Sequence, residues 1–295
     1  MSGIVGLVNT DGAPVDRRLL ARMTDAMRFR GPDAQRMWID ASVGFGHALL
    51  TTTDDARRER QPCTIDGRMW ISADARIDGR DDLTRALAAH GCDAADANDA
   101  ELVLHAYAAW GDRCVERLTG DFAFALWDGP RRRLFCARDR FGVKPFYYAH
   151  RGSALVFSNT LDCVRLHPSV TGELNDLAIA DFLLFQRNQT LDTTAFADIR
   201  RLPAGHALTW AGGHAQVRRY WTLSFDREIR YRRATEYVEH FSDLLTAAVR
   251  DRLRTRRVAV MMSGGLDSTA VESRDRKSTR LNSSHSAKSR MPSSA

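Results

Sequence analysis

The residues best suited to chemistry form one short run late in the sequence, Ser263-Gly264-Gly265-Leu266-Asp267-Ser268. The two glycines would let the backbone approach an anion closely, with several N–H groups free to donate. The two serines add hydroxyl donors, and Asp267 could hold the Mg²⁺ that neutralises a polyphosphate. The run lacks the lysine of the GxxxxGK phosphate loop. It therefore suits pyrophosphate as a leaving group, and the alternative is an ordinary serine-glycine turn.

The elements on either side of this run predict how it is positioned. Residues 258–262 have the composition of a buried parallel strand, and a helix is expected to begin directly after the loop, with its positive end facing the anion. Further upstream, residues 235–253 form an amphipathic pattern that predicts a long helix, which Thr235 can cap. Its apolar stripe consists of Val238, Phe241, Leu245, Ala248 and Val249.

The preceding two hundred residues have a mixed pattern of strands and helices. Strand-like runs occupy residues 3–9, 43–50, 69–75, 122–127, 133–137, 146–149, 154–158, 206–210 and 214–218, and helical spacing occupies 17–27, 81–89 and 100–110. The last six strand-like runs pair across short turn sequences, which predicts three hairpins. Hairpins interrupted by helices indicate two sheets covered by helices, an α+β layered domain.

Composition excludes several classes of protein. The chain has 295 residues, 44% of them hydrophobic, and no apolar run reaches the roughly 18 residues of a membrane span. The first twenty residues lack a signal-peptide pattern. The five cysteines are sparse and have no metal-like spacing, which predicts reduced thiols in a cytoplasmic protein; they are Cys63, Cys92, Cys114, Cys136 and Cys163.

The net charge of +6 is concentrated in the last residues of the chain. Residues 274–295 hold six basic residues against one acid, so about +1 is left for the rest of the chain. They are also rich in serine and nearly free of large apolar side chains, so we expect a disordered, non-native tail from 273 to 295. The charge therefore gives no support to nucleic-acid binding, and neither a nucleic-acid nor a membrane partner is expected.

The chain resembles the glutamine-hydrolysing asparagine synthetase family over residues 1 to about 272. The matching stretches stand in order along the sequence: SGIVG at 2–6, RGPD at 30–33, GH at 46–47, DAE at 99–101, GDFAFALWD at 120–128, ARDRFGVKPFYY at 137–148, LPAGH at 202–206 and SGGLDS at 263–268. Each stretch alone is weak, and the ordered set is hard to obtain by chance.

The resemblance implies a fold and a domain order. Residues 1–216 would form a class II (type 2) glutamine amidotransferase domain, a four-layer αββα N-terminal-nucleophile hydrolase sandwich. Residues 217–234 would be a linker, and 235–272 the truncated start of an ATP-binding synthetase domain of the α/β adenine nucleotide α-hydrolase class. Because the family extends well over a hundred residues further, we expect this polypeptide alone neither to form an adenylate nor to bind ATP tightly.

The resemblance also implies an activity with ATP and Mg²⁺ as cofactors. A carboxylate attacks the α-phosphorus of ATP, pyrophosphate leaves, and an amine opens the acyl-adenylate. The small-molecule substrates would be ATP, a carboxylic acid such as aspartate and, if the amidotransferase site works, glutamine, and a homodimer is a candidate assembly. The implied ATP-binding positions are Met261, Ser263, Gly264, Gly265, Leu266, Asp267 and Ser268, with Asp267 on the metal.

The glutamine site departs from the family at several positions. Ser2 stands where the family has its nucleophilic cysteine, and a hydroxyl is harder to deprotonate than a thiol. Leu49 replaces the arginine that clamps the glutamine carboxylate. Ala73 and Asp74 replace the start of the Asn-Gly-Glu oxyanion stretch, so a donor is lost and a repelling carboxylate is gained. Asp99, which in the family holds the substrate ammonium, is retained.

These departures predict a degenerate glutaminase site in an amide-forming ligase, and two alternatives stay open. In the first, the protein is a relative that closes a lactam or a macrocycle with an amine built into its substrate, which Ser2, Leu49 and Ala73 all fit. In the second, the amidotransferase-like domain is non-catalytic and serves only as a structural partner of the synthetase domain.

Overall fold

The computed structural model describes residues 1–53, 56, 58–226, 228–255, 258, 263 and 265–278. The chain divides into two compact units, Met1–Arg227 and Glu228–Ala295. Among the described residues, no helix combines the length and the apolar character that crossing a membrane requires.

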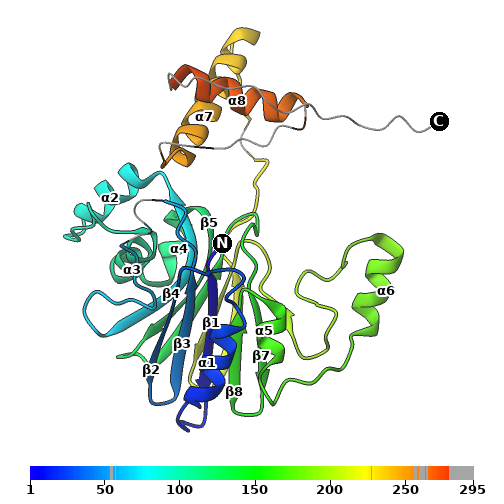
Figure 1. Cartoon of the computed structure of the whole chain (residues 1–295). Coiled ribbons are helices and arrows are strands. Elements are labelled where there is room, and N and C mark those ends of the chain that lie inside the picture. The colour runs from blue at the N-terminus through cyan, green and yellow to red at the C-terminus, as the bar shows by residue number, and fades with distance from the viewer. Residues whose placement is uncertain are drawn as a thin grey trace. The chain divides into compact units, whose positions relative to one another are not determined.

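Two antiparallel sheets form the first unit (Figure 1). One has six strands in the order β2 (Ala34–Asp40), β3 (Val43–Leu49), β1 (Gly3–Asn9), β8 (Ala154–Ser158), β7 (Tyr147–Arg151) and β9 (Arg200–Arg201). The other has five strands in the order β11 (His214–Arg219), β10 (His206–Ala211), β6 (Arg133–Arg138), β5 (Thr119–Asp128) and β4 (Met69–Asp78). The three expected hairpins are β5–β6, β7–β8 and β10–β11, and all three are confirmed.

Helices cover the outer face of each sheet. Helices α1 (Arg17–Asp25) and α5 (Leu161–Arg165) pack on the six-stranded sheet. Helix α3 (Asp99–Trp110) packs on the five-stranded sheet, with α2 (Arg80–Ala88), a 3₁₀ turn (Gly111–Arg113) and α4 (Cys114–Arg117) beside it. A third apolar cluster, which includes Phe45, Phe146 and Phe157, fills the space between the sheets. The expected four-layer αββα sandwich is therefore confirmed.

Strand β5 shows how the sequence produces these layers. Phe122 and Phe124 lie in the cluster beneath the helices, whereas Ala123 and Ala125 face the opposite sheet. Because consecutive side chains of a strand point to opposite faces, an uninterrupted apolar run is buried on both sides. Within the six-stranded sheet, Gly6 leaves room for the ring of its cross-strand partner Phe157, since a Cβ on Gly6 would lie 2.0 Å from that ring.

Several elements differ from the sequence-based expectation. Strand β2, helix α5, strand β9 and helix α6 (Asp176–Phe185) were not predicted, since β2 carries mixed charged and apolar residues and α6 is apolar without a helical stripe. Strand β4 continues to Asp78, three residues beyond the expected end. Strand β11 runs to Arg219 and so takes up the first residues of the expected linker.

In the described part of the second unit, helices α7 (Ala234–Arg252) and α8 (Leu266–Ser278) contact each other. The long helix is confirmed, but its N-cap is Arg233 rather than Thr235, because the Glu236 side chain accepts a hydrogen bond from the Arg233 N–H at 2.9 Å. The expected strand 258–262 lies outside the described residues except for Val258, which is in irregular structure. Helix α8 includes residues 273–278, which the sequence assigned to the tail, and 279–295 lie outside the described residues.

Candidate active site

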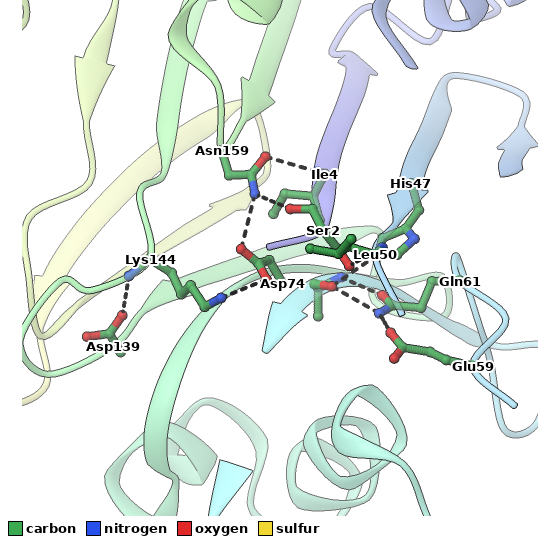
Figure 2. Close-up of polar contacts among 11 residues, drawn as sticks. Ser2, Ile4, His47, Leu50, Glu59, Gln61, Asp74, Asp139, Lys144 and Asn159 are labelled. Atoms are coloured by element: carbon green, nitrogen blue, oxygen red, sulfur yellow. Dashed lines mark hydrogen bonds and ion pairs between the residues drawn. The ribbon is translucent and has the colours of Figure 1, made fainter. Parts of the chain in front are cut away.

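Ser2 lies directly before β1, where the central strand of the six-stranded sheet begins. Its Oγ accepts a hydrogen bond from the Leu50 N–H at 3.1 Å, and its carbonyl oxygen accepts one from Asn159 Nδ2 at 2.7 Å (Figure 2). The neighbouring strand β3 pairs antiparallel with β1, which brings Leu50 to this position. The candidate nucleophile is thus half-buried and fixed through both its side chain and its backbone.

Asn159 is a site residue that sequence reasoning missed. It is fully buried after the end of β8, and its Oδ1 accepts from the Ile4 N–H at 3.0 Å. Its Nδ2 donates to the Ser2 carbonyl and lies 3.4 Å from Asp74 Oδ2. The amide therefore bridges the N-terminal residues to the opposite sheet. Its position in the sequence could have identified it, because Asn159 comes directly after a buried strand and a buried side-chain amide needs hydrogen-bond partners.

Asp74 belongs to a buried ion pair. It lies on β4 facing the six-stranded sheet, and its Oδ1 is 2.9 Å from Lys144 Nζ. Lys144, which sequence reasoning also missed as a site residue, belongs to a loop that is held by several hydrogen bonds. The Asp139 carboxylate accepts from three backbone N–H groups of that loop, those of Phe141, Val143 and Lys144. The loop is thereby held in one conformation that directs the lysine toward Asp74 (Figure 2).

The side chain of Ala73 points away from Asp74 and into the apolar cluster beneath the helices. Its backbone N–H donates to Gln61 Oε1 at 2.6 Å, and its carbonyl accepts from Gln61 Nε2 at 2.9 Å. The His47 Nε2 lies 3.2 Å from the same carbonyl, a contact that requires the Nε2–H tautomer. Burial lowers the pKa of His47 to about 4, so the imidazole is neutral. Hydrogen bonds with Gln61 and His47 thus hold the backbone N–H and carbonyl groups of Ala73 in place.

Leu49 lines a pocket of about 360 Å³ at the end of β2 and β3. The other residues of its wall are Asp33, Ala34, Arg36, His47, Thr51, Glu59, Arg60 and Gln61. The pKa of Glu59 is raised to about 7, chiefly by burial and to a smaller extent by the Asp99, Asp74 and Glu101 carboxylates, whereas the Gln61 side-chain amide acts against this rise by donating to Glu59. Among the described residues that line this pocket, Leu49 is the one that was expected to bind glutamine.

Asp99 is the first residue of α3 and forms an ion pair with Arg80 Nη1 at 2.5 Å. The negative charge of Asp99 helps to raise the pKa of Glu59, which lines the pocket. The structure therefore connects Ser2 and Asp74 through Asn159, places Leu49 beside them on β3, and places Asp99 on the helix layer, paired with a cation.

The predicted ATP-binding run is partly described. The Ser263 and Ser268 hydroxyl oxygens lie 3.3 Å apart, and the Gly265 N–H donates to Ser263 Oγ at 3.4 Å. Helix α8 begins at Leu266, whose side chain is 90% exposed, and Asp267 lies in its first turn. Met261 and Gly264 lie outside the described residues. Hydroxyl and N–H groups thus gather at a helix N-terminus, the arrangement that favours an anion.

Comparison with known proteins identifies both regions of the chain. Residues 1–221 match the glutamine amidotransferase domain family, and residues 240–289 match the asparagine synthase family. The chain is 33% identical over 281 residues to asparagine synthetase (glutamine-hydrolyzing) 3 of Bacillus subtilis (strain 168), covering 92% of this chain and 44% of that protein. It is 29% identical over 287 residues to asparagine synthetase 2 of the same organism, covering 92% and 38%. The chain thus spans less than half the length of these relatives.

The fold has a counterpart among solved structures. Glutamine phosphoribosylpyrophosphate amidotransferase from B. subtilis superposes with a TM-score of 0.54 at 12% identity, over 75% of this chain and 50% of that one. At that identity the likeness concerns the fold, and it agrees with the two-sheet sandwich described above. The ordered motifs, the two family matches and the sandwich together show that this chain belongs to the glutamine-hydrolysing asparagine synthetase family, with a glutamine amidotransferase domain as its first unit.

Proposed function

We propose that the complete protein is an ATP-dependent, amide-forming ligase of the asparagine synthetase type, and that its amidotransferase domain does not hydrolyse glutamine. Support for the ligase comes from the asparagine synthase match at residues 240–289, which includes the SGGLDS run. The carboxylic acid substrate would be a small one such as aspartate.

The described residues of the run fit ATP and Mg²⁺ as cofactors. Ser263 Oγ, Ser268 Oγ and the Gly265 N–H lie together before α8, where the helix end adds positive potential. These groups would hold the phosphates, together with Met261, Gly264 and Leu266, and Asp267 would hold the metal. ATP, when bound, would supply the activating adenylyl group.

The observation that carries the loss of glutaminase activity is the Asp74–Lys144 ion pair. Amide hydrolysis develops negative charge on the carbonyl oxygen, and the family stabilises it with donors. In this chain a buried carboxylate stands at that stretch, held at 2.9 Å by Lys144 and contacted by the same Asn159 that binds the Ser2 carbonyl. A carboxylate accepts hydrogen bonds and donates none, so Asp74 cannot replace the lost donor, and losing one donor alone costs on the order of 100-fold in rate.

Two further substitutions act in the same direction. Ser2 would have to act through a hydroxyl, and Leu49 offers the glutamine carboxylate an apolar wall where an arginine would hold it. Removing an Arg–carboxylate pair costs roughly 2–5 kcal/mol of binding. Both changes fit a protein whose amine comes from its own substrate, so lactam or macrocycle formation is the second candidate function. A purely structural amidotransferase-like domain is the third.

Glutamate release from L-glutamine by the purified chain tests the loss of hydrolysis. We expect no release above background from the natural chain or from Ser2→Cys, with Ser153→Cys, an exposed turn serine, as the matched control for an added thiol. Glutamate release by Ser2→Cys alone would show that only the nucleophile had been lost and would contradict the proposal.

The ligase is tested on the complete reading frame. ATP, aspartate and ammonia should give AMP, pyrophosphate and asparagine. If pyrophosphate forms only with an acid that carries its own amine, the second candidate replaces the first. If no acid supports pyrophosphate release, the third candidate remains, in which the amidotransferase-like domain is purely structural.

A further inference from the structure

Helix α6 is almost entirely apolar, and most of it is exposed. All of its residues except Asp176 and Asp181 are apolar, and Ala178 is its buried residue. Among the described residues, none of the three apolar clusters of the first unit includes a residue of α6, and the helix stands apart from both sheets (Figure 1). Five large side chains are between 55% and 75% exposed, namely Leu177, Phe182, Leu183, Leu184 and Phe185.

The segment that carries α6 has a backbone structure of its own. At its base the Asn175 N–H donates to the Ala195 carbonyl at 2.9 Å, which joins the two ends of the excursion. Asn175 Oδ1 also caps the helix by accepting from the Ala178 N–H at 3.1 Å, and Asp181 Oδ2 accepts from the Gln189 N–H at 3.0 Å. A helix of this length is marginal in water without tertiary packing. The bonded backbone therefore presents apolar side chains that need a cover.

The distribution of the apolar side chains around α6 indicates what kind of partner covers it. Because an α-helix has about 3.6 residues per turn, Phe182, Leu183 and Leu184 point to three different sides. A helix that is apolar all round is normally buried on all sides. A second copy of α6 packed against it would cover one side only, and a helix of ten residues extends about 15 Å, half of what a membrane span requires. The geometry therefore favours a folded domain that encloses the helix.

The asparagine synthase region also lacks a cover for its apolar side chains. Helix α7, which overlaps the residues that match this family, is described throughout and has no buried residue. Its Val238, Phe241 and Leu244 are exposed, although an apolar stripe must be buried against another element to be stable. The chain spans less than half the length of the relatives it matches. A complete asparagine synthase domain would supply the missing layers, and it has the size to enclose α6.

We propose that α6 is the docking surface for the rest of the asparagine synthase domain, which encloses the helix in the complete protein. The inference rests on the proposed function, because it requires that the complete protein contain that domain. The excursion between Asn175 and Ala195 then inserts an apolar helix of the amidotransferase domain into its partner domain. This joint needs no glutamine hydrolysis, so it is compatible with a glutaminase site that has lost its activity.

Hydrogen exchange of the α6 amides tests the proposal. It is measured by mass spectrometry on the purified chain and on the protein from the complete reading frame, each at a low and a high concentration. We expect exchange at least about tenfold slower in the complete protein than in the chain, at both concentrations, because enclosure suppresses local opening of the helix. Equal exchange rates in the two proteins would overturn the proposal.

A double variant assigns the contact to the apolar side chains. Leu183→Gln/Leu184→Gln keeps good helix formers at both positions, so α6 itself should still form. In the purified chain, where both side chains are exposed, the variant should leave the thermal midpoint unchanged. In the complete protein it should lower the midpoint and abolish the slower exchange of α6. Ile65→Gln, at an exposed apolar residue of the loop before β4, is the control and should change neither measurement.

Other occupants of α6 would give different results. Slow exchange that appears only at the high concentration would assign the helix to a contact between copies. Slow exchange that vesicles of phosphatidylcholine and phosphatidylglycerol induce in the purified chain would assign it to a lipid surface. Either result would overturn the proposal.

The inference and the proposed function fail separately. Pyrophosphate release by a complete protein whose α6 exchanges as fast as in the purified chain would overturn the docking surface and leave the ligase intact. Slow exchange of α6 in a complete protein that releases no pyrophosphate with any acid would overturn the ligase and leave the docking surface intact.

Discussion

Lys144 Nζ lies 2.9 Å from Asp74 Oδ1, and this ion pair joins the loop before β7 of one sheet to the edge strand β4 of the other. The two side chains are only 11% and 5% exposed. Removing two charges from water is costly, so such a pair adds little net stability. Its effect is to fix geometry, because it places a carboxylate beside the residues that hold Ser2.

Breaking this pair from one side should destabilise the domain strongly. Lys144→Met leaves the Asp74 carboxylate buried without a cation, and we expect a loss of about 3–5 kcal/mol in the free energy of unfolding measured with urea. The double variant Asp74→Asn/Lys144→Met should recover most of that loss. Arg85→Met, which breaks an exposed pair with Asp82, is the control and should change little. Equal stability of Lys144→Met and the natural chain would contradict the buried pair.

Asn159→Ala should loosen the N-terminal residues. The change removes the acceptor of the Ile4 N–H and the donor to the Ser2 carbonyl, and unsatisfied buried groups cost about 1–3 kcal/mol each. Hydrogen exchange should become faster at Ile4 and stay unchanged in α3. Asn188→Ala, which removes a part-buried amide bonded to Thr193, provides the comparison. Unchanged exchange at Ile4 would show that Asn159 does not fix this segment.

Gly6→Ala should destabilise the sandwich by overpacking. A Cβ at this position would lie 2.0 Å from the Phe157 ring, which is fully buried between the sheets. Forcing a methyl group into a filled core typically costs about 1–3 kcal/mol. Gly172→Ala is the matched control, because that Cβ meets nothing within 4 Å. Thermal unfolding of the two variants should therefore differ, and equal midpoints would be incompatible with this packing.

Stability should fall on acidification because of His47. Burial lowers the pKa of His47 to about 4, below the unfolded value of about 6.5, so the unfolded chain binds more protons between these values. Its contribution is present above pH 6.5 and is lost as the pH falls toward 4, by up to about 3 kcal/mol. His47→Gln should flatten this part of the urea-unfolding profile, and His150→Gln, at an exposed position, should not. A profile with the same slope in His47→Gln would assign the acid sensitivity elsewhere.

The fold was predictable where one apolar pattern dominated. Strand β1 was predicted with its observed bounds, because its residues are buried almost throughout and a turn sequence ends it. Strand β2 was missed because its alternation is weak, and the antiparallel pairing with β3 is what makes it a strand. The N-cap of α7 was placed wrongly at Thr235, since the Glu236 side chain bonds to the Arg233 backbone instead.

The candidate site was predictable only as a set of positions. Ser2, Leu49, Ala73, Asp74 and Asp99 were singled out by resemblance, and their substitutions could be read from the sequence. Lys144 and Asn159 were not, because each is about seventy or more residues from the group it contacts and belongs to a different strand or loop. A linear pattern carries no information about which distant side chains meet.

The sequence by itself determined the family, the alternation of strands and helices, and the types of residue at the nucleophile and clamp positions, because these depend on local composition and ordered motifs. Only the tertiary structure decided that Asp74 is neutralised by Lys144, that the Ala73 side chain leaves the site, and that Arg36 lies beside Leu49 in a charged pocket. The physical reason is that burial and charge pairing arise from the packing of two sheets, which brings together residues far apart in the chain.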